Sequence, residues 1–463
     1  MLEWFSIFLT MFKMKPLCLF LLGFFAFGDI NCKGKNQNVL LIAIDDLNDW
    51  IGCLKTNSQA KTPNIDRLAS RGMLFTNAHC QAPICNPSRT SFMLSLRPST
   101  TGIYENQPWF RSVKETKNRI TMGEHFVKNG YRTLTAGKIF HASKICKSSF
   151  QTYGPMPGQY SKKDKRIHKD SPSRTKLWDF GPQDYPEEEH SDYQVASWCI
   201  DQLKNHSEAP FFMAIGFYRP HVPLFAPKPY FESRPLNKVR LPEILFNDRD
   251  DLPSEALQLI HNTLPPSHKW FVDSGKWKNA VRAYNACITF TDHQIGRILD
   301  ALDSSPYRDN TIIVLFSDHG FHLGEKQMWA KRSLWERSTR VPLIISTPHG
   351  LKGVSCSRPV ELLSIFPTLS ELCKLPNPLD IDGLSITKLL EDPRSDWSHP
   401  AITTFKEGNH SIRTERYRYI RYANGSEELY DHKTDYNEWN NVINDQQYSK
   451  VRQNHSKYLS TLE

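Results

Sequence analysis

The chain of 463 residues has no internal repeat, no low-complexity tract and no nucleic-acid-binding motif. These absences argue against a repeat protein, a low-complexity protein and a protein that binds DNA or RNA. The cysteines beyond residue 32 also lack the spacing of a disulfide framework or a zinc site, although a disulfide or two could form in an oxidising compartment. The sequence therefore assigns no particular pairing among Cys53, Cys80, Cys146, Cys199, Cys287, Cys356 and Cys373.

Near the amino terminus, the apolar run from Leu17 to Phe27 is too short to span a bilayer. It follows Lys13 and Lys15, which is the charge pattern of a signal peptide. We therefore expect residues 1–32 to be a signal peptide and the mature protein to be exported without a transmembrane span.

Two features of this leader stay open. Either Met1 or Met14 could be the true start of the chain. Cys32 ends the leader and loosely resembles the cysteine of a lipoprotein signal, so lipid anchoring at the cell surface is an alternative to the periplasm or secretion.

The remaining composition is that of a soluble globular protein, with 39% hydrophobic and 23% charged residues. The length allows one large α/β domain with a smaller companion. The net charge of +9 suits a polyanionic substrate through electrostatic steering, but a merely basic soluble surface explains it equally well.

Buried-strand patterns alternate with helical ones along most of the chain. The pattern predicts strands at 38–44, 131–135, 211–217, 311–316 and 341–346. It predicts a helix at 64–71, closed by Gly72 as a C-cap, and an amphipathic helix at about 281–302. This alternation indicates a large α/β/α sandwich with a mainly parallel central sheet, which we assign to residues 33–395.

Two segments depart from this pattern. Residues 155–180 contain Gly, Pro and seven basic side chains between Lys162 and Lys176, which indicates a solvated loop or, as the alternative, a lid that grips polyanions. Residues 396–463 predict a small antiparallel sheet closed by a terminal helix, since 411–422 alternates and Asn424-Gly425 is a strong turn signal.

Polar side chains cluster where the predicted strands end. Asp45 and Asp46 follow one strand, and Asp318 and His319 follow another. Ligands of open α/β sheets bind beyond the carboxyl ends of strands. Three carboxylates in one cleft repel unless a cation neutralises them, and oxygen-rich clusters suit calcium or magnesium. The sequence therefore predicts a divalent metal ion there.

The stretch from Cys85 to Phe92 reads CNPSRTSF and predicts the start of a helix. Pro87 fits the first turn, where its missing N–H costs nothing, and a helix N-terminus attracts an anion. The alternative is a buried cysteine before an ordinary helix.

These motifs together resemble the type I, formylglycine-dependent sulfatases of the alkaline phosphatase superfamily, and most closely the iduronate-2-sulfatase branch. The resemblance runs from Asn38 to about Leu390 and is based on six motifs in order: Asp45-Asp46, Cys85 to Arg89, Gly137 to His141, Pro220 to Pro223, Ser317 to Gly320, and Lys331 in Trp329-Ala330-Lys331.

The resemblance implies that a formylglycine-generating or sulfatase-maturating enzyme converts Cys85 to formylglycine (3-oxoalanine). It further implies one calcium ion held by Asp45, Asp46, Asp318, His319 and the modified residue 85. Arg89 would orient the aldehyde hydrate, and the groups around the sulfate would be Lys138, His141, His221 and Lys331.

In this interpretation the hydrate attacks sulfur, and the leaving sugar oxygen takes a proton from His221 or Lys331. His141 then assists release of sulfate. The substrate would be a sulfated carbohydrate of glycosaminoglycan or algal type, such as ulvan. Trp109 could lie against a sugar ring and Arg111 on a uronate carboxylate, unless their loop simply packs on the domain.

Two other functions remain as alternatives. One is a phosphatase, phosphonate monoester hydrolase or phosphodiesterase of the same superfamily. The members with two zinc ions need a Ser or Thr nucleophile and additional Asp and His ligands, a set that this sequence lacks. The other is a non-catalytic binder of sulfated glycans, which the basic composition allows.

Overall fold

A nine-stranded sheet organises the protein, for which a computed structural model describes residues 37–141, 144–173, 177–261 and 264–461. The expected signal peptide at residues 1–32 lies outside these ranges, and the described residues form one compact unit. The strand order is β12 (Val354–Cys356), β2 (Met73–His79), β11 (Arg340–Ser346), β8 (Thr311–Ser317), β1 (Asn38–Ile44), β6 (Phe211–Phe217), β3 (Arg132–Gly137) and β4 (Thr152–Tyr153), with β13 (Val360–Glu361) also paired to β2.

The sheet is mainly parallel, as the sequence predicts. Strand β11 runs antiparallel to both β8 and β2, whereas β1, β6, β3 and β8 pair in parallel. Strands that are covered on both faces need apolar side chains in both directions, which explains the continuous apolar runs of β1 and β6.

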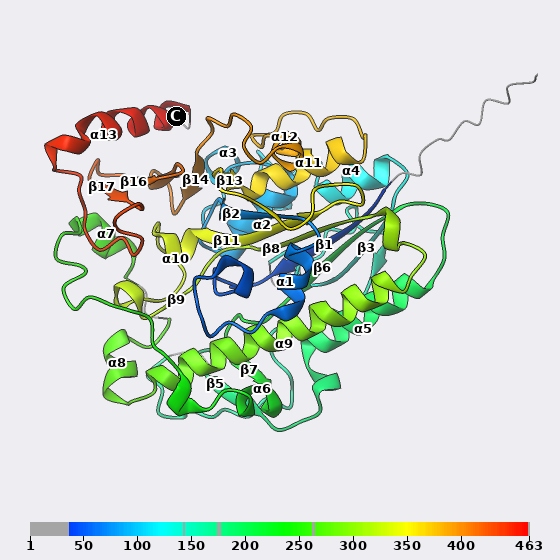
Figure 1. Ribbon diagram of the computed structural model, residues 1–463, viewed down its shortest axis with the longest axis horizontal. Helices are drawn as coiled ribbons and strands as arrows, with labels where there is room; N and C mark the ends of the chain where they lie inside the picture. Colours follow the sequence, from blue (N-terminus) through cyan, green and yellow to red (C-terminus); the bar gives the residue numbers. More distant parts are fainter. Residues whose placement is uncertain (1–36, 142–143, 174–176, 262–263, 462–463) are drawn as a thin grey trace, which may run out of the picture. The chain divides into compact units, whose positions relative to one another are not determined.

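Helices cover both faces of the sheet (Figure 1). Leu40, Ile42 and Ile44 of β1 pack into a core with α1 (Pro63–Ala69), α5 (Ser191–Lys204) and α9 (Trp277–Asp303). The alternate β1 residues Val39, Leu41 and Ala43 pack toward α2 (Cys85–Leu94), α4 (Met122–Lys128) and α11 (Ile365–Leu372). The predicted α/β/α sandwich is therefore confirmed.

Shorter elements connect these layers. The helices are α3 (Pro98–Thr101), α6 (Lys228–Glu232), α7 (Ser254–Leu259), α8 (His268–Asp273), α10 (Glu336–Thr339) and α12 (Thr387–Glu391). The strand pairs are β5 (Phe180–Gln183) with β7 (Leu224–Pro227) and β9 (His322–Leu323) with β10 (Trp329–Ala330). Within the described residues, no helix is long and apolar enough to cross a membrane.

Gly72 does not cap a helix, which corrects the prediction from sequence. Helix α1 ends at Ala69 and its C-cap is Ser70. A Cβ atom at position 72 would lie 2.4 Å from the carbonyl oxygen of Ile345, so glycine is needed because strand β11 passes close by. The prediction failed because the cause is a contact distant in sequence.

The carboxyl-terminal region is a four-stranded antiparallel sheet of β14 (Ala401–Thr404), β15 (His410–Arg413), β16 (Tyr417–Arg421) and β17 (Glu427–Asp431), followed by α13 (Ser449–Ser456). The predicted small sheet with a terminal helix is present. The alternating stretch 411–422 is not one strand, because residues between β15 and β16 form a turn. Gly425 has φ of 87° in the predicted turn before β17.

Buried charges join this small sheet to the segment around α10. Arg418 is fully buried and donates hydrogen bonds to two carboxylates. Its Nη2 donates to Glu336 Oε2, and its Nε lies 2.5 Å from Glu438 Oε1. Arg413 Nε lies 3.2 Å from the same Glu336 oxygen, and His432 Nε2 lies 2.9 Å from Glu438 Oε1. Burial alone would raise the pKa of Glu438, but Arg418 and His432 lower this pKa to about 2.

The substitution Arg418→Met should destabilise the protein by about 3–5 kcal/mol, because it leaves two buried carboxylates short of their common cation. Chemical unfolding monitored by circular dichroism would measure the change. The matched control is Arg452→Met. Arg452 is half-exposed on α13 and pairs with Glu427 of the same sheet, so its loss should cost less than about 1 kcal/mol. Equal losses in the two variants would contradict this assignment.

Candidate active site

The side chains predicted to act together do meet at one edge of the sheet. Asp45 and Asp46 directly follow β1, Lys138 follows β3, and Asp318 follows β8. The parallel arrangement of these strands brings their carboxyl ends to one edge. The fold therefore brings charged side chains from distant segments of the sequence together at one site.

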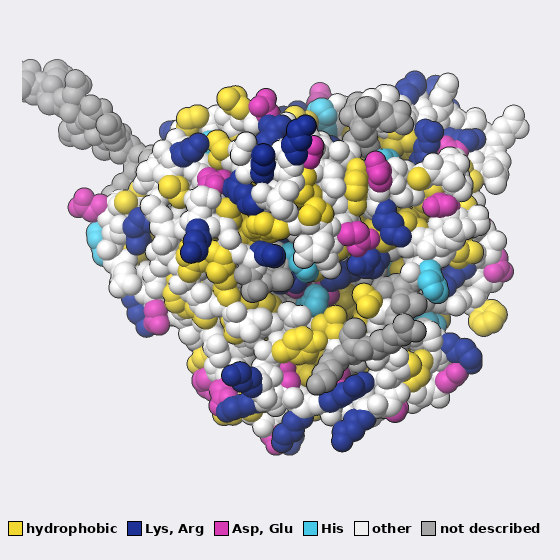
Figure 2. All heavy atoms as spheres, turned by 180° about the vertical axis from the view of Figure 1, so that it is seen from behind, with side chains coloured by type: hydrophobic (Ala, Val, Ile, Leu, Met, Phe, Trp, Pro, Cys, Tyr) yellow, Lys and Arg dark blue, Asp and Glu magenta, His cyan; other side chains and the backbone are white. Residues whose placement is uncertain are grey.

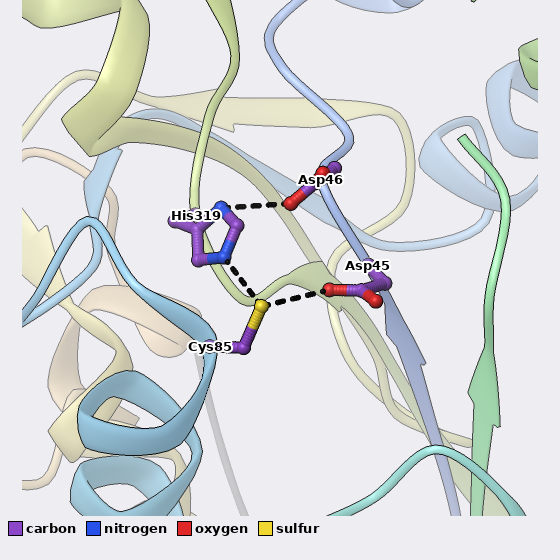
Figure 3. A group of neighbouring side chains, drawn as sticks. All are labelled: Asp45, Asp46, Cys85 and His319. Carbon is purple, nitrogen blue, oxygen red and sulfur yellow. Dashed lines mark hydrogen bonds and ion pairs between the residues drawn. The ribbon is translucent and has the colours of Figure 1, made fainter. Parts of the chain in front are cut away.

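Cys85 is the first residue of α2 and is 1% exposed. Its Sγ lies 3.5 Å from Asp45 Oδ1 and 3.3 Å from His319 Nε2, so the side chain points between these two groups (Figure 3). Lys331 Nζ lies 3.3 Å and Lys138 Nζ 3.7 Å from the same sulfur. The cysteine is buried, but it faces a polar cluster rather than the apolar core.

Each of the three aspartates is paired with a cation. Lys138 donates to Asp45, Lys331 Nζ lies 2.5 Å from Asp46 Oδ1, and Arg89 Nε lies 2.8 Å from Asp318 Oδ2. The three carboxylates have no exposed surface. Charges buried so deeply persist only with such partners.

The backbone after β1 is bent sharply at Asp46, whose φ of 65° is unusual for a residue other than glycine. Three hydrogen bonds hold it there. Asp46 N donates to Asp318 Oδ1 at 3.1 Å, and the Tyr284 hydroxyl donates to Asp46 O at 2.7 Å and accepts from Asn48 N at 2.9 Å. The sequence analysis missed Tyr284, although a polar tip on the inward face of a long helix could have indicated it.

Asp45, Asp46, Cys85 and His319 each offer an atom within 4.8 Å of the others, so this group could hold a metal ion. Asp46 Oδ2 is buried and has no hydrogen-bond partner, as expected of an oxygen awaiting a cation. Asp318 was also predicted as a ligand and lies beside the group, with its oxygens bound to Asp46 N and Arg89. The oxygen-rich donor set fits a hard divalent cation.

The charges shift the pKa of the central groups. Burial alone would raise the pKa of Cys85, but Lys138, Lys331 and His319 hold it well below its ordinary value. Burial raises the pKa of Asp318 to about 7 despite Arg89. Burial lowers the pKa of His319, but Asp318 outweighs this effect and raises it to about 8. The position of residue 85 thus favours negative charge.

Two further histidines lie at the cluster. His221 Nε2 is 4.0 Å from Asp46 Oδ2, and its Nδ1 is 2.6 Å from Val222 O. His141 contributes to the lowered pKa of Cys85. The loop that holds His221 is anchored by buried Asp192, which accepts from the backbone N–H groups of Tyr218 and Arg219 at 2.7 and 2.9 Å. Sequence reasoning missed Asp192, because its partners are backbone atoms.

The predicted sugar contacts of Trp109 and Arg111 do not fit the structure. Arg111 lies 2.6 Å from Glu124 Oε2 and stacks over Phe110, with the guanidinium carbon 4.7 Å from the ring centroid. Trp109 packs its ring against Phe110 and Phe140. The alternative, a loop that packs its aromatics on the domain, is what the structure contains.

Positive side chains also gather on the molecular surface. The face drawn in Figure 2 is hollowed near its centre, and Lys, Arg and His side chains lie in this hollow. Such a concentration of positive charge suits an anionic ligand.

The eight cysteines of the described part are all free, so no disulfide forms there.

The family follows from comparison with known proteins. The sulfatase family model matches residues 37–375, and a model named N-sulphoglucosamine sulphohydrolase, C-terminal, matches residues 324–463. The chain belongs to the sulfatase family. It is therefore an enzyme that hydrolyses sulfuric esters.

Named relatives agree with this. A sulfatase of Formosa agariphila is 41% identical over 424 residues, which cover 88% of this chain and 83% of that protein. The iduronate 2-sulfatase of Mus musculus is 30% identical over 396 residues, covering 74% of this chain and 69% of that one. The predicted likeness to the iduronate-2-sulfatase branch is thereby supported.

Solved structures share the fold. A protein in complex with its substrate D-glucosamine-2-N,6-O-disulfate has a TM-score of 0.73 at 22% identity and covers 92% of this chain and 97% of its own. A phosphonate monoester hydrolase from Silicibacter pomeroyi has a TM-score of 0.77 at 20% identity, covering 92% of this chain and 94% of its own. At such identities the likeness shows the fold alone.

Removing the hydroxyl of Tyr284 should weaken the site without unfolding the protein. We expect Tyr284→Phe to lower hydrolysis of an aryl sulfate by about tenfold or more, because the bend at Asp46 loses its support. The matched control is Tyr307→Phe, whose hydroxyl likewise bridges Asn205 O and Ser207 N but lies just before the amino end of β8. Equal activity in the two variants would show that the Tyr284 hydroxyl does not support the site.

Proposed function

We propose that this sulfatase is an exported, calcium-dependent enzyme that removes sulfate esters from a sulfated carbohydrate through a formylglycine formed at Cys85. The observation that carries the proposal is the environment of Cys85. The side chain lies at a helix N-terminus, buried, with two lysines and a histidine within 3.7 Å of its sulfur. An anionic group at this position is stabilised whatever its chemical identity.

When formed by a formylglycine-generating or sulfatase-maturating enzyme, the aldehyde hydrate supplies an oxygen nucleophile at residue 85. The chain's own residues do the rest. Lys138 and Lys331 neutralise the sulfate oxygens, since both ammonium groups already lie against residue 85. Arg89 Nη2 is buried without a hydrogen bond, 3.4 Å from Asp45 Oδ1, and is the atom that would orient an oxygen at residue 85.

Proton transfer falls to the remaining cationic groups. We assign His221 or Lys331 as the donor to the leaving sugar oxygen and His141 as the group that takes a proton when sulfate is released. His141 is suited to this because it helps to lower the pKa of residue 85 and its Nδ1 is buried without a hydrogen-bond partner. His221 reaches the cluster from the opposite side, beside Asp46.

Calcium is the metal that the donor set favours. Asp45, Asp46, Asp318, His319 and the modified residue 85 would hold it, and the ion would stabilise negative charge on the oxygens it contacts. Carboxylate oxygens that are buried together and one orphaned Asp46 oxygen support this choice. Lys138 and Lys331 would then turn from the aspartates to the substrate.

A sulfated, uronate-containing glycan is the proposed substrate class. The chain is similar to an iduronate 2-sulfatase, and its net charge of +9 favours a polyanion. The charged and apolar pattern of residues 13–27 supports export to the periplasm, the cell surface or the medium, with a lipid anchor at Cys32 as the alternative. A glycosaminoglycan or an algal polymer such as ulvan fits these properties.

The phosphonate hydrolase alternative has the weaker support. It rests on a shared fold at 20% identity, whereas the relative named sulfatase is 41% identical. Relative rates on matched sulfate, phosphate and phosphonate esters separate the two, since a sulfatase should prefer the sulfate. A binder of sulfated glycans without catalysis would turn over none of these esters.

The substitution Cys85→Ala should abolish sulfate release, lowering the rate by roughly 10³-fold or more, because no nucleophile can form. Release from an aryl sulfate measures this. Mass spectrometry of the unchanged protein should show the peptide that contains Cys85 lighter by the exchange of sulfur for oxygen and the loss of two hydrogens. The control Cys80→Ala removes another buried cysteine. Full activity of Cys85→Ala would refute the nucleophile.

Removal of divalent cations should also abolish activity. After treatment with a chelator and dialysis, we expect added calcium to restore sulfate release, because the site presents hard oxygen ligands. Thermal unfolding gives a readout independent of catalysis, since an ion that binds the folded protein raises the melting temperature. Restoration by zinc but not by calcium would contradict the assignment.

A further inference from the structure

A second cleft, of about 270 Å³, lies on α9 and shares none of its lining residues with the active site. Its walls come from the segment before α1, the turn after α6 and the N-terminal part of α9. Four of the lining side chains are basic and none is acidic. The lining comprises Gln59, Lys61, Ser233, Arg234, Pro235, Lys238, Val239, Arg282 and Asn285.

Arg234 has no carboxylate within ion-pair distance in the described part of the chain. Its side chain is 7% exposed, and its guanidinium donates only to neutral acceptors, Gln59 O at 2.8 Å and the hydroxyl of Thr289. Its Nε is buried without an acceptor. Burial lowers the pKa of Arg234 to about 10, without any carboxylate to offset it. The buried Arg89 and Arg418, by contrast, each contact two carboxylates.

The other cations of this cleft are also unpaired. Among the described residues, no carboxylate lies within ion-pair distance of Lys61, Lys238 or Arg282. Lys61 donates to Ser233 O at 2.9 Å, and Arg282 donates to Phe231 O at 2.7 Å while its Nε stays buried without an acceptor. An unpaired buried charge destabilises a protein, so an anion from outside would supply what the chain does not.

The cleft also offers an acceptor. Asn285 is 2% exposed, and its Oδ1 has no donor. A ligand that combines anionic groups with hydroxyl donors would satisfy both needs. Sulfated or uronic sugars have this combination, whereas inorganic sulfate offers no comparable set of hydroxyl groups.

A neighbouring cleft of about 370 Å³ extends the same surface. Gln59 lines both clefts, and it is hydrogen-bonded to Arg240, which lines the second. Tyr436, a residue that is 38% exposed, lies farther along. Glu243 and Glu325 also line this second cleft, and its Arg337 is paired with Asp49 and Glu325. Arg240, which forms no ion pair among the described residues, and the Tyr436 ring thus continue the basic surface of the first cleft. Basic side chains over two adjoining clefts suit a chain of sugars better than a single ion.

We propose that the cleft between Lys61, Arg234, Lys238 and Arg282 binds a sulfate or carboxylate group of a sulfated glycan, as a second site apart from the active site. This rests on the proposed substrate class. A polysaccharide held there would stay associated with the enzyme, and its local concentration at the active site would rise. The site would not act on the bound group.

The test is the charge reversal Lys61→Glu/Lys238→Glu, because both lysines are exposed and can be changed without loss of buried contacts. Heparin serves as the polysulfated probe, with binding measured by titration at two salt concentrations. The matched control, Lys352→Glu/Lys450→Glu, reverses two exposed lysines elsewhere and has the same net charge. We expect at least about tenfold weaker heparin binding for the first pair relative to the control.

The opposite outcomes are equally clear. Equal affinity of the two double variants, or no heparin binding by the unchanged protein, would overturn the proposal. A second arm measures stabilisation by inorganic sulfate in thermal unfolding: if the reversal changes this response but not heparin binding, the cleft holds only an ion and the glycan site is wrong. Binding requires no turnover, so failure of the proposed catalytic function would leave this result interpretable.

Discussion

Charge neutralisation around Cys85 is the interaction on which the rest of the site depends. Three aspartates without exposed surface would repel one another, and three cations offset them: Lys138, Lys331 and Arg89. Because the three aspartates follow β1 and β8 while the cations come from α2 and from the segments after β3 and β10, the balance exists only in the folded sheet. The arrangement therefore couples the parallel topology directly to chemistry, since any strand out of place would leave a buried charge unpaired.

The fold was largely predictable because its signals are local. A strand covered on both faces must be apolar in both directions, and β1 and β6 have the bounds that this pattern predicts. The incorrect predictions concern residues whose role is determined by a contact with another part of the sequence. Gly72 is needed because β11 passes close by, and Arg111 is bound by Glu124 rather than free for substrate. Neither partner can be deduced from neighbouring residues.

The candidate site was predictable for a different reason. Most of the groups lie within a few residues of the end of a strand, and Cys85 begins a helix, so the order of motifs along the chain implies that they meet at one edge of the sheet. The supporting residues were not predictable in this way. Tyr284 and Asp192 act on backbone atoms of the loops that hold Asp46 and His221, and hydrogen bonds to backbone leave no recognisable motif.

The buried arginines show how the two positively charged regions differ. Arg89 and Arg418 lie against carboxylates of the same chain, so their charges stabilise the fold. Arg234 has only neutral acceptors, and its charge is a cost that folding does not repay. An anionic ligand that binds at Arg234 would offset this unfavourable burial. The same physical rule thus identifies Arg89 as part of the architecture of the active site and Arg234 as part of a surface that is complete only with an anionic ligand.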